Sequence, residues 1–264
     1  MSTPAKFNDL AKSANDLLNK DFAVGFLIAD LKHKYNAPDS VAIQTIGLAV
    51  TSTVSTNGAL SEQVEFNNAL FSGLKFDLFG SFLQNGKHAL RTGVEYKQDY
   101  VTTTASADIL KGPTISADIV VGSDGVYAGS EVGYDVQSGT LTKYNAATAY
   151  NGSNYTVSLH ALNSFKTFTA SYFHRVNSTV EAGGKATWNY KSDKESDITV
   201  EVASKYTLDK DSYMKTKLDS VGKLGLSYTQ NLRRGVKITL AGLFDTYRLQ
   251  ENAHKIGLNL VFEA

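Results

Sequence analysis

The 264-residue sequence has no cysteine, only three prolines and no excess charge, with 26 basic and 26 acidic side chains. Without cysteine, the chain forms no disulfide framework and no thiolate metal or redox site. So few prolines argue against a disordered, low-complexity chain. A net charge of zero gives no overall attraction to nucleic acid, so we expect no nucleic-acid partner.

Long hydrophobic runs are also missing. A membrane-spanning helix needs about 18 or more apolar residues in a row, and no segment approaches that length. The first twenty residues lack the apolar core of a secretory signal, because Asp9, Lys12, Asn15 and Asp16 interrupt it. These absences exclude a helical membrane bundle and predict that no cleaved signal exports the chain. These absences do not exclude a membrane β-barrel, because the strands of such a barrel alternate polar and apolar residues.

One amphipathic helix is predicted within residues 1–22. Apolar residues recur at helical spacing and form a single stripe of Phe7, Leu10, Ala11, Ala14, Leu17 and Leu18. Asp9, Lys12, Asp16 and Lys20 fall on the opposite side. The same pattern also fits an ordinary surface helix of a globular domain, so this segment alone does not decide its environment.

Beyond Phe22 the hydrophobic period changes to two. About 17 segments of roughly ten residues alternate apolar with polar or small side chains, and Gly, Asn, Asp or Ser separate them. Ile198, Val200 and Val202, for example, alternate with Thr199 and Glu201. Such alternation places the two sets on opposite faces of a β-sheet. About 14 residues per strand plus turn suit strands that cross a bilayer at a tilt.

Two β architectures are consistent with this alternating pattern. A soluble sandwich or propeller would bury its apolar face, whereas a membrane barrel would turn that face to lipid and keep a polar lumen. Alternation continues through Phe262, and aromatic residues such as Tyr96 and Tyr190 stand at segment ends, as in the interfacial girdles of barrels. We therefore predict an all-β membrane protein in which residues 23–264 form a single closed antiparallel transmembrane β-barrel. With about 17–19 strands, such a barrel encloses an aqueous channel.

Cations on the polar face would line this channel. Strand parity places there Lys32, Arg91, Lys185, Lys215, Lys217, Lys223, Lys237 and Lys255, and the helix adds Lys12 and Lys20. Fixed positive charge raises the local concentration of anions. Acidic side chains that include Asp16, Asp30 and Glu95 offset part of it, so we predict a weak preference for anions. Each lysine taken alone fits a solvated wall equally well.

No catalytic or metal-binding constellation stands out. The five histidines are scattered without metal-ligand spacing. A phosphate-binding P-loop is absent, since His follows Gly86-Lys87 and Ala follows Gly184-Lys185. We expect neither an enzyme nor a bound metal or cofactor.

Several stretches resemble the voltage-dependent anion channels, the mitochondrial porins, of the fungal type. They are the run from Phe7 to Phe22, the tripeptide Gly73-Leu74-Lys75, the signature-like stretch from Tyr206 to Tyr228, and the strand from His254 to Phe262. Lys210 departs from the small or acidic residue usual in that signature. Between Val41 and Glu65 the sequence is about a hairpin shorter than the family norm, which keeps the parity of the barrel.

The resemblance implies a voltage-gated, weakly anion-selective channel of the mitochondrial outer membrane, with the helix inside the pore and the first and last strands parallel. Its permeants would be ATP, ADP, phosphate and other small anions, and its partners membrane lipids; a homo-oligomer stays open. Gly73, Leu74 and Lys75 would contact nucleotide, although a turn and a strand start explain this tripeptide equally well.

Two alternatives remain at this point. The protein-import channel of the same membrane shares the barrel, but it would carry an N-terminal extension and acidic lumen patches for basic presequences. A soluble β-rich binding protein would need no detergent after purification.

Overall fold

The computed structural model describes residues 3–24, 27–36, 47–55, 59–67, 72–83, 88–110, 112–190, 197–248, 250–251 and 254–263. They belong to two compact units, each described here by itself. Unit 1 comprises Met1–Asp9, Asp30–Ala146 and Glu263–Ala264, and unit 2 comprises Leu10–Ala29 and Ala147–Phe262.

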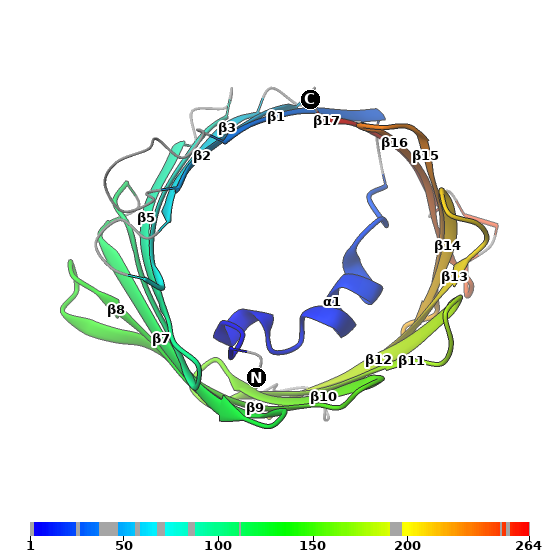
Figure 1. The fold of residues 1–264 in the computed structure, drawn as a ribbon. Helices are drawn as coiled ribbons and strands as arrows, with labels where there is room; N and C mark the ends of the chain where they lie inside the picture. The colour runs from blue at the N-terminus through cyan, green and yellow to red at the C-terminus, as the bar shows by residue number, and fades with distance from the viewer. Residues whose placement is uncertain are drawn as a thin grey trace. The chain divides into compact units, whose positions relative to one another are not determined.

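The described residues contain a 3-10 turn η1 (Phe7–Asp9), one α-helix α1 (Lys12–Asn19) and seventeen strands (Figure 1). The prediction of an all-β protein is therefore confirmed, and the strand count falls in the expected range. None of the helices described is both long enough and apolar enough to cross a bilayer.

Unit 1 is an antiparallel meander in which neighbours in sequence are neighbours in the sheet. Its strands are β1 (Leu27–Asn36), β2 (Gly47–Ser55), β3 (Ala59–Asn67), β4 (Leu74–Leu83), β5 (His88–Lys97), β6 (Val101–Asp108), β7 (Thr114–Ser123), β8 (Val126–Asp135) and β9 (Thr140–Asn151). The first residues of β1 and the last of β9 are counted with unit 2.

Unit 2 repeats the meander with the helix added. Its strands are β10 (Tyr155–Leu162), β11 (Thr167–Arg175), β12 (Val180–Asn189), β13 (Asp197–Thr207), β14 (Ser212–Asp219), β15 (Lys223–Arg233), β16 (Val236–Asp245) and β17 (Lys255–Glu263).

Tight turns hold the meander in register. Between β7 and β8, Asp124 and Gly125 have φ of 51° and 86°, and Ser123 pairs directly with Val126. A two-residue hairpin turn with positive φ at both positions matches the right-handed twist of the strands, and Asp-Gly is a favoured sequence for it.

The shortened segment predicted near Val41 lies in part outside the described residues, which resume at Gly47 in β2. Closure of the strands into a barrel, with its first and last strands parallel, stays a prediction.

Helix α1 covers less of the N-terminus than residues 1–22, because the chain forms η1 and then a turn before Lys12. All six side chains of the predicted stripe are nevertheless buried. An eight-residue helix without a side-chain cap at its N-terminus is marginal on its own. Its stability must therefore come from packing against the sheet.

That packing lies on β11, β12 and β13 of unit 2. Leu17 and Leu18 are buried with Ala203, and Phe173 packs against them. A Cβ at Gly183 would come 2.6 Å from the Tyr172 carbonyl oxygen and 3.2 Å from Leu17 Cδ2, so glycine lets the helix approach the sheet.

Candidate functional site

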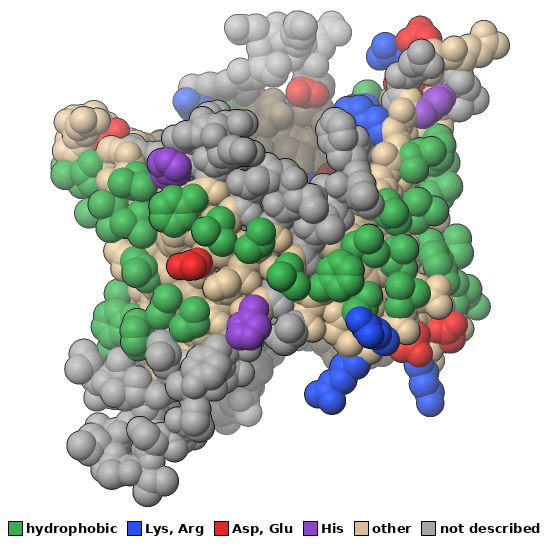
Figure 2. Space-filling view, turned by 90° about the horizontal axis from the view of Figure 1, so that it is seen from above, with side chains coloured by type: hydrophobic (Ala, Val, Ile, Leu, Met, Phe, Trp, Pro, Cys, Tyr) green, Lys and Arg blue, Asp and Glu red, His purple; other side chains and the backbone are tan. Residues whose placement is uncertain are grey.

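The strands present an apolar face and a polar face. On β13 in unit 2, Ile198, Val200 and Val202 are 42–55% exposed, whereas Ala203 on the other face is buried under the helix. In Figure 2, hydrophobic side chains gather across the visible strands, and most charged side chains lie above and below them. Exposed apolar surface of this extent marks an interface with a membrane or another protein.

Aromatic side chains stand at both ends of the apolar face in unit 2. At one end, the Trp188 ring lies 5.6 Å from Phe168 and 5.8 Å from Tyr190, measured between centroids. At the other end, Tyr172 stacks on His174. Phe168 and His174 are six positions apart in β11, which is about 20 Å of strand. Two aromatic rows about this far apart are typical of the girdles that flank a lipid-facing band.

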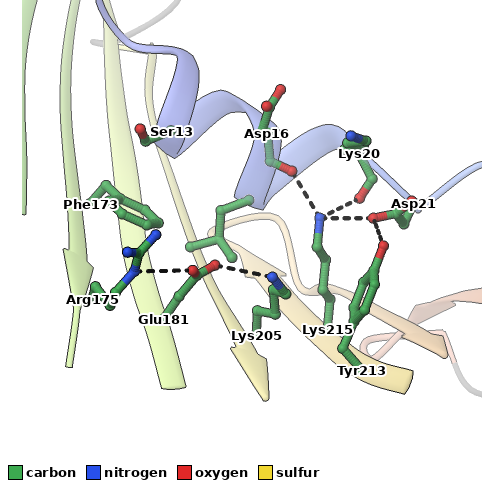
Figure 3. A pocket seen from close by; sticks show the side chains of 11 residues that line it. Ser13, Asp16, Lys20, Asp21, Phe173, Arg175, Glu181, Lys205, Tyr213 and Lys215 are labelled. Carbon is green, nitrogen blue, oxygen red and sulfur yellow. Dashed lines mark hydrogen bonds and ion pairs between the residues drawn. The ribbon is translucent and has the colours of Figure 1, made fainter. Parts of the chain in front are cut away.

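On the polar face of unit 2, Lys215 holds the end of the helix (Figure 3). Its Nζ donates to the backbone oxygens of Asp16 (3.0 Å) and Lys20 (3.1 Å) and lies 3.0 Å from the carboxylate of Asp21. The Lys215 side chain is only 5% exposed. The Asp16 oxygen also accepts the Lys20 N–H at 3.2 Å, so Lys215 is a second donor to it. The Lys20 oxygen lies at the C-cap, where carbonyls have no partner within the helix, so there the cation satisfies an open acceptor.

Asp21 is the anion at the centre of this cluster. Its carboxylate also pairs with Lys237 Nζ at 3.1 Å and accepts a hydrogen bond from the Tyr213 hydroxyl at 2.9 Å. Burial by itself would raise the pKa of Asp21, but the cations of Lys215 and Lys237 and the Tyr213 hydroxyl together hold this pKa below its ordinary value.

This direction predicts how helix attachment depends on pH. A depressed pKa means that ionised Asp21 stabilises the attached state at neutral pH. That contribution should stay constant down to about pH 4 and fall as the carboxylate protonates below it. Amide hydrogen exchange of α1 between pH 6 and pH 3, corrected for intrinsic rates, measures the effect. Asp21→Asn should abolish the pH dependence, and an unchanged dependence in that variant would refute the assignment.

A cavity of about 280 Å³ lies between α1 and β11–β14, wholly within unit 2. Glu181 bridges two cations on its wall, with Arg175 Nε at 3.5 Å and Lys205 Nζ at 3.4 Å (Figure 3). Four basic and three acidic side chains line this cavity: Lys20, Arg175, Lys205, Lys215, Asp16, Asp21 and Glu181. The lining therefore has a slight excess of positive charge.

Among the other predicted cations on the strands of unit 2, one is paired with a carboxylate and the others form no ion pair in the described structure. Lys185 is neutralised by Glu201 at 2.8 Å. Lys217 lies 4.8 Å above the Phe22 ring, and Lys223 and Lys255 are exposed at the starts of β15 and β17. The side chains of Lys12, Asp16 and Lys20 on the helix are likewise exposed.

Fewer predicted residues belong to unit 1. Arg91 donates to the Ser106 hydroxyl at 2.8 Å. Asp30 and Lys32 lie in β1, paired with Ser55 and Thr53, but their side chains are outside the described part of the structure.

The tripeptide Gly73-Leu74-Lys75 forms a turn and the start of β4. Gly73 has φ of 88°, its oxygen accepts the Lys97 N–H at 2.9 Å, and a Cβ there would collide with the Lys97 carbonyl. Leu74 is buried, and Lys75 pairs with Glu65 at 2.8 Å. Backbone geometry thus accounts for the glycine, and a nucleotide contact stays a prediction. Across the described residues, no group of His, Asp and Glu is placed to hold a metal ion.

Unit 1 has its own attachment for the N-terminus. The Pro4 oxygen accepts a hydrogen bond from Thr102 at 2.7 Å, and Lys6 pairs with Glu95 at 2.8 Å. Phe7 is 1% exposed, and η1 contacts β7 and β8.

Sequence reasoning missed Asp21, Tyr213 and Lys205 as parts of the site. Strand parity could have found two of them, because Tyr213 and Lys205 share the face of Lys215. Asp21 carried no such signal, since it lies in the link after the helix with φ of 71°.

Comparisons with known proteins agree on one family. The sequence profile described as eukaryotic porin matches residues 3–257. The mitochondrial outer membrane protein porin of Neurospora crassa is 38% identical over the full length of both chains, and that of Candida albicans is 37% identical over 99% of each. The Neurospora alignment spans 287 positions against 264 residues here, so that relative has residues that this chain lacks. The non-selective voltage-gated ion channel 1 of Saccharomyces cerevisiae is 30% identical over 99% of this chain.

Among solved structures, a triple mutant of Rhodopseudomonas blastica porin superimposes with a TM-score of 0.60. The superposition covers 86% of this chain and 94% of the Rhodopseudomonas chain, at 10% sequence identity. The similarity therefore concerns the fold alone.

Proposed function

This chain belongs to the eukaryotic porin family, and we propose that the cationic polar face of unit 2 gives its channel a weak preference for anions. The protein is a voltage-dependent channel of the mitochondrial outer membrane for metabolites and ions, and not an enzyme. Its exposed apolar face and aromatic rows suit contact with lipid, and its polar face suits contact with water.

Lysines whose ammonium groups form no ion pair in the described part of the chain carry the selectivity proposal. In the described part of the chain, Lys217, Lys223 and Lys255 have no ion-pair partner, whereas Lys185, Lys215 and Lys237 do. A charge that no carboxylate cancels attracts anions from solution over roughly 8–10 Å at physiological salt. Three such charges on one polar face bias permeation without excluding cations.

The proposed permeants are ATP, ADP and inorganic phosphate, because each is a small anion that such a face would concentrate. The proposed partners of the apolar face are membrane lipids. Helix α1 packs on the polar face, beside the cations, so we assign it to the water-filled side of the channel. A homo-oligomer stays a prediction.

Reversal potentials in planar bilayers under a KCl gradient test the proposal. The wild-type chain should favour chloride slightly. Replacing Lys217, Lys223 and Lys255 with glutamine should shift the chloride-to-potassium permeability ratio toward cations by about twofold, given screened charges in water.

Lys210→Gln is the matched control, because Lys210 carries the same charge in the exposed β13–β14 turn. This control removes one charge, whereas the triple variant removes three. A shift in the control of about one third of the triple variant's shift, or more, would therefore assign the effect to net charge, and no shift in the triple variant would refute the role of the three lysines. The absence of any conductance in the wild-type chain would overturn the channel function itself.

A further inference from the structure

The apolar face of unit 2 has a hollow of about 220 Å³ over β14, β15, β16 and β17. Apolar side chains dominate its lining, and no charged side chain takes part. It lies on the opposite face of these strands from the helix and the lysines.

Gly242 creates this hollow. It occupies the apolar row of β16 between Leu240 and Phe244, and its register partners are Leu226 on β15 and Ile256 on β17. Each of these four neighbours is a large apolar residue, so the missing side chain at Gly242 leaves a depression with hydrocarbon walls.

The walls of the hollow stay open to the outside. Leu240 is 51% exposed and Ile256 is 67% exposed, while Met214 and Tyr228 complete the row on the β14 side. A Cβ at Gly242 would come 2.7 Å from the Phe244 ring, so this ring leans over the depression and forms one end of it.

The size and chemistry of the hollow select a hydrocarbon occupant. An enclosed apolar cavity of about 150 Å³ accepts benzene and stays dry otherwise, so this hollow has room for a length of alkyl chain. It is also continuous with the exposed apolar band that faces lipid, which makes acyl chains the molecules present at the highest concentration beside it.

A cation follows β16, the strand that carries Gly242 and Phe244. Four residues after Phe244, the Arg248 side chain is 64% exposed. Its Nε and Nη1 form ion pairs with Asp245 (3.6 Å) and Glu251 (3.7 Å), and its Nη2 takes part in neither pair. A guanidinium near the membrane surface suits the phosphate of a phospholipid headgroup. A sterol has no group that would use this charge.

We propose that this hollow is a binding site for one acyl chain of a membrane phospholipid whose phosphate lies at Arg248. The proposal rests on the membrane location stated under the proposed function. It adds a fixed lipid position at one place on the apolar face of unit 2.

Photolabelling of the full-length chain tests this site. The probe is phosphatidylcholine with a photoactivatable diazirine in its acyl chain, diluted into phosphatidylcholine vesicles that hold the protein. Peptides spanning residues 226–244 should be labelled more strongly than other lipid-facing strands. Gly242→Leu fills the hollow and should lower that labelling about fourfold or more, the factor expected for each methylene that loses its burial.

Gly80→Leu is the matched control, because Gly80 stands between Leu78 and Phe82 on the lipid-facing row of β4, and a Cβ there meets only the Phe82 ring at 3.6 Å. It should leave the labelling of residues 226–244 unchanged. Arg248→Gln should weaken labelling by the phospholipid but not by a diazirine fatty alcohol, which lacks the phosphate.

Several results would overturn the proposal: even labelling of all strands, labelling that Gly242→Leu leaves unchanged, displacement of the probe by a sterol, or cross-links between two copies through this face. Conductance recorded on the same vesicles separates the two claims. A conducting channel without the labelling pattern rejects the lipid site alone, whereas a wild-type chain that does not conduct rejects the proposed function.

Discussion

Replacing Asp21 with asparagine should release helix α1 from the sheet of unit 2. The Asp21 and Lys215 side chains are 8% and 5% exposed, so the variant would leave a buried ammonium without its counter-ion. Removal of one partner of a buried ion pair costs about 3–5 kcal/mol. Amide hydrogen exchange in α1 should therefore accelerate by about 100-fold or more, since each 1.4 kcal/mol is about a factor of ten.

Asp16→Asn is the control for this variant. It makes the same change of charge within the helix, five residues before Asp21, but the Asp16 side chain is exposed and only its backbone oxygen accepts from Lys215. It should leave α1 exchange within a few-fold of wild type. Equal acceleration in both variants would mean that helix charge in general, and not the Asp21 ion pairs, holds the helix.

Phe7→Ala should detach the N-terminal segment from unit 1. Phe7 is 1% exposed, and its ring lies 3.2 Å from where a Cβ of Gly129 would stand; the fully buried Val120 lies 2.9 Å from the same point. Truncation of a buried phenylalanine costs about 3–5 kcal/mol, because the apolar contacts are lost and a cavity remains. Limited trypsin digestion should then cleave after Lys6 much faster than in the wild-type chain.

Asn8→Ala provides the comparison, because Asn8 is the exposed neighbour of Phe7 in η1. Its digestion rate should match that of wild type. A Phe7→Ala chain that resists trypsin as well as wild type would show that Lys6, Glu95 and the Pro4–Thr102 hydrogen bond suffice to hold the segment.

The strands were predictable because alternation is a local property. A side chain at position i points to the opposite face from one at i+1, so residue order alone assigns the exposed Ile198, Val200 and Val202 to one face. The same parity grouped Lys215, Lys217 and Lys237 on the other face, where they contact the helix or the residues that follow it.

The bounds of the helix were harder to predict from the sequence than the strands were. The apolar stripe correctly marks which N-terminal side chains are buried, but it continues through η1 and the turn before Lys12. Hydrophobic periodicity records the side that is buried, and it is insensitive to a change from 3-10 to α-helical hydrogen bonding within that side.

For this protein, the sequence alone determined the all-β class, the two faces of the strands, the amphipathic N-terminus and the resemblance to mitochondrial porins. Each follows from residue order over a few positions, or from a match along the chain. Only the tertiary structure decided which lysines are neutralised, that Asp21 joins Lys215 and Lys237 beneath the helix, and that Gly242 opens a hollow between neighbouring strands. These properties depend on distances between residues as much as 216 positions apart, and such distances exist only after the strands have paired.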